Sequence, residues 1–316
     1  MMMNMYNILY YTGVFCMLLY LLQIYIITCW NIDFPMFWNI GPYIGSAFFS
    51  LLLLFIWYHI ILVSKLKMNF VIKTILMICI FVLPFILVLP VISIYNLILL
   101  FYCNNPPFID DINSVFIENK ELEDNYEFVY KKELDTIYHE NSNADCIAKN
   151  LPGFAIGKVN EKCWRAIYIK ILNNFTIKDL HVKCPNLYKL LNKSYISNAF
   201  LSILDAHVDI PKHFGYFKGY YRYHLGYIIP EHNGVRPFIV CGNQKYEWEE
   251  GKGVLFDDIY NHYVRNDTPY RRVVLYLDIV RPELRNMITD SMIWLLSKNI
   301  ILQKLDKSQH KQRSLK

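Results

Sequence analysis

Residues 213–226 read HFGYFKGYYRYHLG, and residues 256–275 read FDDIYNHYVRNDTPYRRVVL. His213 in the first stretch and His262 in the second each lie beside the predicted end of a β-strand. Imidazole suits Fe(II), and non-haem iron sites usually add a carboxylate as the third ligand. The customary position for that carboxylate, two residues after the first histidine, is Gly215. Either the site is not an iron site, or water fills the third position, and the two histidines alone favour the interpretation as ordinary histidines.

Each histidine has an arginine downstream of it. Arg222 and His224 are two residues apart in a predicted strand, so their side chains share one face. Arg272 begins an apolar run that is predicted to be buried on both faces, where a charge needs a partner. That partner is either an aspartate such as Asp257 or Asp278, or the carboxylate of a ligand held by two guanidinium hydrogen bonds.

From about residue 162 onward, short apolar segments alternate with turn residues. This pattern predicts many short strands and therefore a sandwich or a barrel. A helix, Asn186–Asn192, is predicted after Cys184-Pro185. The predicted strands are Lys162–Leu172, Phe200–Val208, Tyr220–Ile229, Pro237–Val240, Lys245–Trp248, Gly253–Phe256 and Arg272–Val280.

Residues 1–103 are predicted to form a transmembrane region of about three helices. The stretches 5–29, 42–63 and 74–103 contain no Asp, Glu, Lys or Arg, and each is long enough to cross a bilayer core. Lys65, Lys67 and Lys73 lie between the second and third stretches, so that loop is expected on the cytoplasmic side. The chain after residue 103 is then lumenal or external, or cytosolic if residues 74–103 make two passes.

Two further segments flank the predicted β domain of residues 161–285. Residues 104–160 form an acidic connector, in which Leu122, Phe128, Leu134 and Tyr138 are spaced for one face of a docked helix, or the segment is a solvated spacer. Residues 286–316 are predicted to be an amphipathic helix and a basic tail. No nucleic-acid-binding module is recognisable.

Eight cysteines show no metal-binding spacing, and five of them follow the predicted spans. One or two disulfides are expected among those five if that part of the chain faces an oxidising compartment.

The order of short motifs after residue 162 is that of a known family. Trp164, Cys184-Pro185 and Ala199-Phe200-Leu201-Ser202 come first, then His213-x-Gly215 with Arg222-x-His224-Leu225-Gly226. They are followed by Trp248-Glu249-Glu250-Gly251-Lys252, Phe256-Asp257-Asp258 before His262, Arg272-Val273-Val274-Leu275, and Asp278-Ile279-x-Arg281-Pro282. In this order and spacing, residues 162–284 resemble the aspartyl/asparaginyl β-hydroxylase family, which includes the bacterial lipid A hydroxylases.

The resemblance implies a fold and a set of roles. The fold is a double-stranded β-helix, an all-β jelly roll of the cupin type, with flanking helices. The cofactor is Fe(II), held by His213 and His262, and the co-substrates are 2-oxoglutarate and O2. Arg272 would pair with the distal carboxylate of 2-oxoglutarate, and Ser202, Arg222 and His224 would assist at its carboxylates.

The substrate is left open by the sequence. Leu204 stands where some members have methionine, and the loop with Phe217 and Tyr220 is bulkier than in others. The resemblance implies hydroxylation of a C–H bond, first the β-carbon of Asp or Asn in a protein and alternatively a lipid acyl chain. A third interpretation is a membrane scaffold with an inactive oxygenase-like domain.

Overall fold

The computed structural model describes residues 105–141 and 162–285, apart from 214 and 216, and the single positions 99, 144, 146, 147 and 290. The predicted spans 5–29 and 42–63 lie outside these residues, and so does 74–103 apart from Leu99. The predicted tail helix lies outside them as well, apart from Asp290. Within the described residues, no helix combines the length and the apolar character that crossing a bilayer requires.

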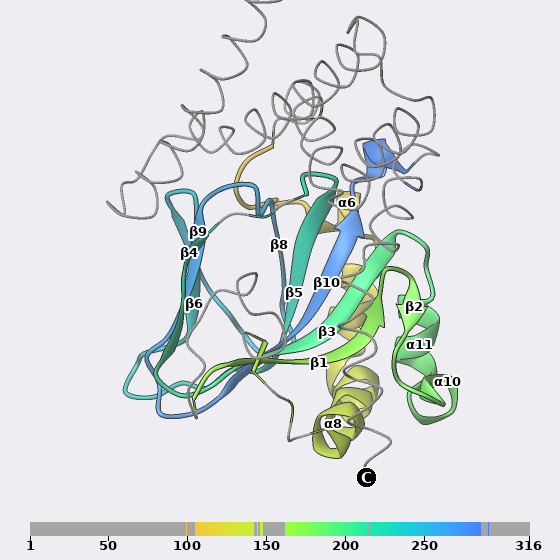
Figure 1. Ribbon diagram of the computed structural model, residues 1–316, viewed down its shortest axis with the longest axis horizontal. Coiled ribbons are helices and arrows are strands. Elements are labelled where there is room, and N and C mark those ends of the chain that lie inside the picture. The colour runs from red at the N-terminus through yellow and green to blue at the C-terminus, as the bar shows by residue number, and fades with distance from the viewer. Residues whose placement is uncertain are drawn as a thin grey trace, which may run out of the picture. The chain divides into compact units, whose positions relative to one another are not determined.

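Two antiparallel sheets form the β domain of the chain (Figure 1). The larger sheet has the order β2-β1-β3-β10-β5-β8, and the smaller sheet has the order β4-β9-β6-β7. The larger sheet consists of β1 (Trp164–Ile171), β2 (Asn174–Phe175), β3 (Ile196–Leu204), β5 (Tyr220–Ile228), β8 (Gly253–Phe256) and β10 (Arg272–Val280). The smaller sheet consists of β4 (Val208–His213), β6 (Phe238–Cys241), β7 (Gln244–Glu247) and β9 (His262–Asn266).

The connections identify the fold as a double-stranded β-helix. The chain crosses from one sheet to the other between most successive strands from β3 to β10, and the first and last of these strands pair in the larger sheet. Such a double-sheet jelly roll keeps its apolar side chains between the sheets. Leu204, Val274 and Phe256 from the larger sheet accordingly pack with Ile239 and Val264 from the smaller one.

Two predicted boundaries differ from the structure in ways that affect the site, and the position of His213 agrees with it. The segment predicted as Phe200–Val208 is two strands, because the chain turns at residues 205–207, where His207 has φ of 59°. His262 is the first residue of β9 rather than part of a loop. His213, expected at the end of a strand, is the last residue of β4.

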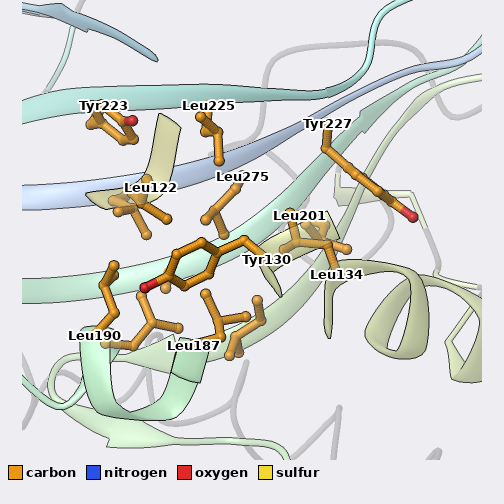
Figure 2. Close-up of a cluster of buried hydrophobic side chains, with 14 of the residues drawn as sticks. Leu122, Tyr130, Leu134, Leu187, Leu190, Leu201, Tyr223, Leu225, Tyr227 and Leu275 are labelled. Atoms are coloured by element: carbon orange, nitrogen blue, oxygen red, sulfur yellow. The ribbon is translucent and has the colours of Figure 1, made fainter. Parts of the chain in front are cut away.

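Helices cover the outer face of the larger sheet. Their packing decides whether the acidic connector is a docked helix or a solvated spacer. They are α6 (Ile112–Val115), α7 (Glu118–Asp124), the π-helical turn η2 (Tyr126–Tyr130), α8 (Lys131–Glu140), α10 (Leu180–Lys183) and α11 (Pro185–Leu191). The short 3₁₀ helix η3 (Pro282–Leu284) follows the last strand. Figure 2 shows Leu122, Tyr130 and Leu134 packed against Leu201 and Leu275 of the sheet. The acidic segment is therefore a docked layer of helices.

The predicted apolar face of that segment is wrong at one position. Leu122 and Leu134 are fully buried, whereas Phe128 is 80% exposed. The wider π-helical turn between α7 and α8 shifts the helical phase, so Tyr126 and Tyr130 take the buried positions. The hydroxyl of Tyr126 donates a hydrogen bond to the main-chain oxygen of Tyr227 at 2.8 Å.

A disulfide joins Cys146 to Cys163, just before β1. This bridge realises one of the pairings that the sequence left open. Cys184 and Cys241 are free and buried. The main-chain N–H of Cys163 donates to the Asp205 carboxylate at 2.9 Å, which ties the bridged position to the end of β3.

Docking of the helices predicts a contrast between two substitutions. Leu134→Ala is expected to lower the free energy of unfolding by about 2–5 kcal/mol, because it leaves a cavity against the sheet. Phe128→Ala, on the exposed side of the neighbouring turn, is expected to change it by less than about 0.5 kcal/mol. Urea titration followed by tryptophan fluorescence measures both, and equal costs would show that the segment is not docked.

Candidate iron and dicarboxylate site

Strand pairing in the smaller sheet brings the two predicted metal ligands together. His213 on β4 lies opposite His262 on β9, and their ring centroids are 4.1 Å apart. Nδ1 of His213 lies 2.8 Å from the main-chain oxygen of Pro211, and Nδ1 of His262 lies 2.9 Å from that of Tyr260. A carbonyl can only accept, so each Nδ1 carries the proton and each Nε2 keeps its lone pair.

Both imidazoles are neutral at physiological pH. Burial, together with the neighbouring His262, lowers the pKa of His213 to about 3. Burial lowers the pKa of His262 to about 4. Metal ions bind the neutral form of imidazole, so these two side chains do not have to lose a proton to act as ligands.

Asp258 fills the space beside Gly215. A Cβ atom added at Gly215 would overlap the Asp258 carboxylate, so no larger residue fits there unless Asp258 moves. The main-chain N–H of Gly215 donates to the main-chain oxygen of Asp258 at 2.6 Å. An acidic residue at position 215 would place its carboxylate in this space. In this chain the carboxylate of Asp258, from the turn before β9, occupies the space instead.

Arg222 is bound to two acids of the chain. Its Nε donates to Asp258 at 2.6 Å, and its Nη1 contacts the Asp278 carboxylate. Burial raises the pKa of both aspartates, and the Arg222 charge opposes that shift. Arg222, predicted to assist at the co-substrate's carboxylates, therefore lies in the structure as the partner of two buried carboxylates.

Arg272 is buried without an acid partner among the described residues. It is 1% exposed, and Nη1 approaches the main-chain oxygen and the hydroxyl of Ser202 only at 3.4 and 3.5 Å. Its Nε has no hydrogen-bond partner within the described part of the chain. The aspartates considered for it are bound elsewhere, because Asp257 pairs with Lys218 and Arg281. Burial lowers the pKa of Arg272 to about 9.

His224 lines the space between the two arginines. Its partner across the ladder is Tyr276 of β10, and the rings of Trp248 and Phe256 lie 5.8 and 5.0 Å from it. Both ring nitrogens are buried without a hydrogen-bond partner among the described residues. Burial lowers its pKa well below the usual value. A buried imidazole in this state can still donate to a ligand through one nitrogen and accept through the other.

Two residues at the site were not among the predicted functional residues. Asp258 lies within the matched Phe256-Asp257-Asp258 motif, but its position against Gly215 depends on tertiary structure. Trp248 is fully buried under the Arg272 guanidinium, with 4.5 Å from Cζ to the ring centroid. Across the described residues, no three or more His, Cys, Asp or Glu side chains converge as a metal site.

Comparison with protein families places this geometry in context. Residues 119–282 match the family model described as aspartyl/asparaginyl β-hydroxylase. The ornithine lipid ester-linked acyl 2-hydroxylase of Rhizobium tropici is 40% identical over 100 residues, which are 31% of this chain and 35% of that protein. The mouse aspartyl/asparaginyl β-hydroxylase is 36% identical over 83 residues, which are 26% of this chain and 11% of that protein.

Among solved structures, a prolyl hydroxylase from Trichoplax adhaerens in complex with a hypoxia inducible factor peptide fragment is similar at a TM-score of 0.35. It is 9% identical, and the match covers 52% of this chain and 80% of that one. The chain thus spans about a third or less of the two curated relatives described above.

Neutral buried histidines predict how stability depends on pH. The pKa of His262 is 6.5 when unfolded and about 4 when folded, so its contribution is complete above pH 6.5 and is lost as the pH falls toward 4. The free energy of unfolding of the metal-free protein should decrease over this range by about 1.4 kcal/mol per pH unit for each such histidine. Urea titrations between pH 7 and pH 5 in the presence of a chelator measure the slope.

The control separates this effect from general acid sensitivity. His262→Gln should have a shallower slope than the parent, whereas His232→Gln, at an exposed position, should keep the parent slope. Equal slopes for the parent and His262→Gln would contradict the assignment of a buried neutral imidazole.

Proposed function

Because this chain belongs to the aspartyl/asparaginyl β-hydroxylase family, we propose that it is a hydroxylase that uses Fe(II), 2-oxoglutarate and O2. The observation that carries the proposal is the guanidinium of Arg272, buried without an acid of the described chain to neutralise it. An isolated buried charge is costly, so an anionic ligand is the partner that this position favours. A planar guanidinium binds a carboxylate through two parallel hydrogen bonds.

The residues present also fit an iron ion. His213 and His262 would hold it through Nε2, because hydrogen bonds to main-chain carbonyls occupy Nδ1 in both rings. Asp258 lies beside them with Oδ1 free of hydrogen bonds within the described residues, and Arg222 fixes its other oxygen. Ferrous iron at this place supplies the activation of O2 that couples oxidation of 2-oxoglutarate to succinate and CO2 with hydroxylation of a C–H bond.

The protein's own contribution is to orient the co-substrate and to exclude water. Arg272 and Ser202 would bind its distal carboxylate, and His224 would donate to its remaining oxygen atoms. Arg222 contributes indirectly in this proposal, since it holds Asp258 and Asp278 in place. The rings around His224 are apolar, which keeps solvent from the reacting atoms.

For the substrate we propose first the β-carbon of an Asp or Asn residue in a protein. The description of the matched family and the names of the mouse and human relatives support this choice.

A lipid acyl chain is the second candidate, and a row of aromatic side chains favours it. Tyr168, Phe200 and Tyr276 lie side by side across β1, β3 and β10, with ring centroids 5.4 and 4.1 Å apart. All three are half-buried, and Tyr276 lies 5.0 Å from His224 at the site. An uncharged aromatic surface leading to the site suits a hydrocarbon chain. The Rhizobium relative, at 40% identity, is named as an acyl hydroxylase.

We further propose that the protein is anchored in a membrane and that the catalytic domain lies on the lumenal or external side. The bridge between Cys146 and Cys163 supports this side, because disulfides persist in oxidising compartments. The charge-free stretches of residues 1–103 and the basic loop at Lys65, Lys67 and Lys73 support the same arrangement.

The full chain is expected to release succinate from 2-oxoglutarate in an iron-dependent reaction even without a substrate. His213→Ala should reduce this release to background, because a two-histidine set cannot lose one ligand and retain its metal. Arg272→Ala should raise the required concentration of 2-oxoglutarate by about 30-fold or more, since the loss of a buried charged partner costs about 2–5 kcal/mol. Succinate is measured by mass spectrometry.

Matched variants at exposed positions serve as controls for this assay. His232→Ala and Arg236→Ala should leave succinate release unchanged. Release that survives both His213→Ala and Arg272→Ala would show that the protein is not an oxygenase of this kind and would favour the scaffold interpretation.

The same assay separates the two substrate classes. An Asp- or Asn-containing peptide, or a lipid with an ester-linked acyl chain, should stimulate succinate release and gain one oxygen atom. Tyr168→Ala should slow turnover of the lipid but not of the peptide if the aromatic row binds the acyl chain.

The disulfide predicts the redox environment of the domain. Cells quenched with acid and treated with a polyethylene glycol maleimide should show two additional modified thiols after reduction, and Cys146→Ser/Cys163→Ser should lose that difference. The shift is measured on a denaturing gel. Free thiols at both positions in quenched cells would contradict the lumenal or external placement.

A further inference from the structure

Trp248 has a buried hydrogen-bond donor that nothing in the described chain accepts. Its side chain is 0% exposed, and Nε1 has no partner among the described residues. Buried N–H groups are almost always paired in proteins, and an unpaired one costs about 1–3 kcal/mol. An orphaned indole N–H in a well-packed interior therefore needs an explanation.

Packing prevents the Trp248 ring from turning to find an acceptor. The ring lies in the cluster between the sheets with Val254, Phe256 and Val274. Its main-chain N–H donates to the main-chain oxygen of Pro237 at 3.4 Å, which places the residue at the end of β7. The indole N–H is thus held in a fixed place, and the acceptor must come to it.

The second unpaired donor belongs to Arg272, whose guanidinium lies over the Trp248 ring. The Arg272 guanidinium sits over the Trp248 ring, 4.5 Å from Cζ to the centroid, and Arg272 Nε also lacks a partner in the described part of the chain. Two unpaired donors, one of them charged, therefore belong to side chains that lie against each other. A carboxylate has two oxygens and about four lone-pair sites, so it can accept from both.

Two acids of the described residues that flank β3 and β10 are already bound to arginines other than Arg272. Asp205 accepts from Arg165 and Arg271, and Asp278 contacts Arg222. A carboxylate from a ligand remains as the acceptor that would satisfy both donors.

We propose that the indole N–H of Trp248 donates, beside the Arg272 guanidinium, to the distal carboxylate of the five-carbon 2-oxo diacid. The inference rests on the proposed function and adds to it a residue that selects for a dicarboxylate. Trp248 also supports the guanidinium through the face of its ring, so it acts on the ligand in two ways. Removal of the N–H tests the hydrogen bond, and an aromatic residue in its place keeps a smaller ring under the guanidinium.

Trp248→Phe in the full chain makes that change. With Zn(II) in place of iron, so that no turnover occurs, 2-oxoglutarate should bind about 10-fold or more weakly by calorimetry, as expected for a lost hydrogen bond to a charged acceptor. Binding of 2-oxopentanoate, which has the same chain length but no distal carboxylate, should be unchanged. The ratio of the two dissociation constants is thus the readout that a general loss of packing would not move.

A matched control is Tyr223→Phe. Tyr223 is equally buried, and its hydroxyl donates to Asn119 on the outer face of the larger sheet, away from the site. This variant should keep both dissociation constants. Zn(II) affinity should be the same for the parent and for both variants.

A second measurement does not depend on the variant. In parent protein labelled with ¹⁵N at the indole nitrogens, 2-oxoglutarate should shift one of the six tryptophan N–H resonances downfield, and 2-oxopentanoate should not.

The outcomes separate this inference from the proposed function. If the parent binds no 2-oxo diacid, the proposed function fails. If the parent binds it and Trp248→Phe changes the affinity by less than two-fold, or weakens both ligands equally, the role of Trp248 is overturned while the function stands.

Discussion

One buried aspartate, Asp258, connects the two strands that carry His213 and His262. Its main-chain oxygen accepts from Gly215, two residues after His213, and it lies four residues before His262. Its side chain is bound by Arg222 of β5, which also contacts Asp278 of β10. The smaller sheet is thereby joined to the larger one through charges that would each be costly if left alone. The separation of the two imidazoles depends on this network.

The larger sheet could be predicted from sequence far better than the smaller one. The boundaries of β8 and β10 were predicted correctly, because these strands are continuous apolar runs buried on both faces. Strands β4 and β9 were not predicted, since they alternate buried and exposed residues over a short length and β4 contains Pro211. The prediction that Phe128 lies on the buried face of the helical segment was wrong, because a π-helical turn has no recognisable pattern of residues.

The candidate site, like the fold, could be predicted from the sequence only in part. The roles of the histidines and arginines came from a resemblance in motif order. The structure brings His213 to His262 and, among the residues that it describes, gives Arg272 no acid partner. The binding of Arg222 to two aspartates could not be read from the sequence, because both acids lie far from it along the chain. The pairing of Cys146 with Cys163 was likewise one of several possible connectivities among five cysteines.

The crowding between Gly215 and Asp258 also limits how such a protein can evolve. A carboxylate gained at residue 215 by a single substitution would collide with the one already present, and two like charges would share one buried space. Loss of Asp258 first would leave Arg222 with one acid instead of two. Each single substitution is therefore expected to destabilise this pocket. A carboxylate at residue 215 is compatible with the pocket only if Asp258 is replaced at the same time.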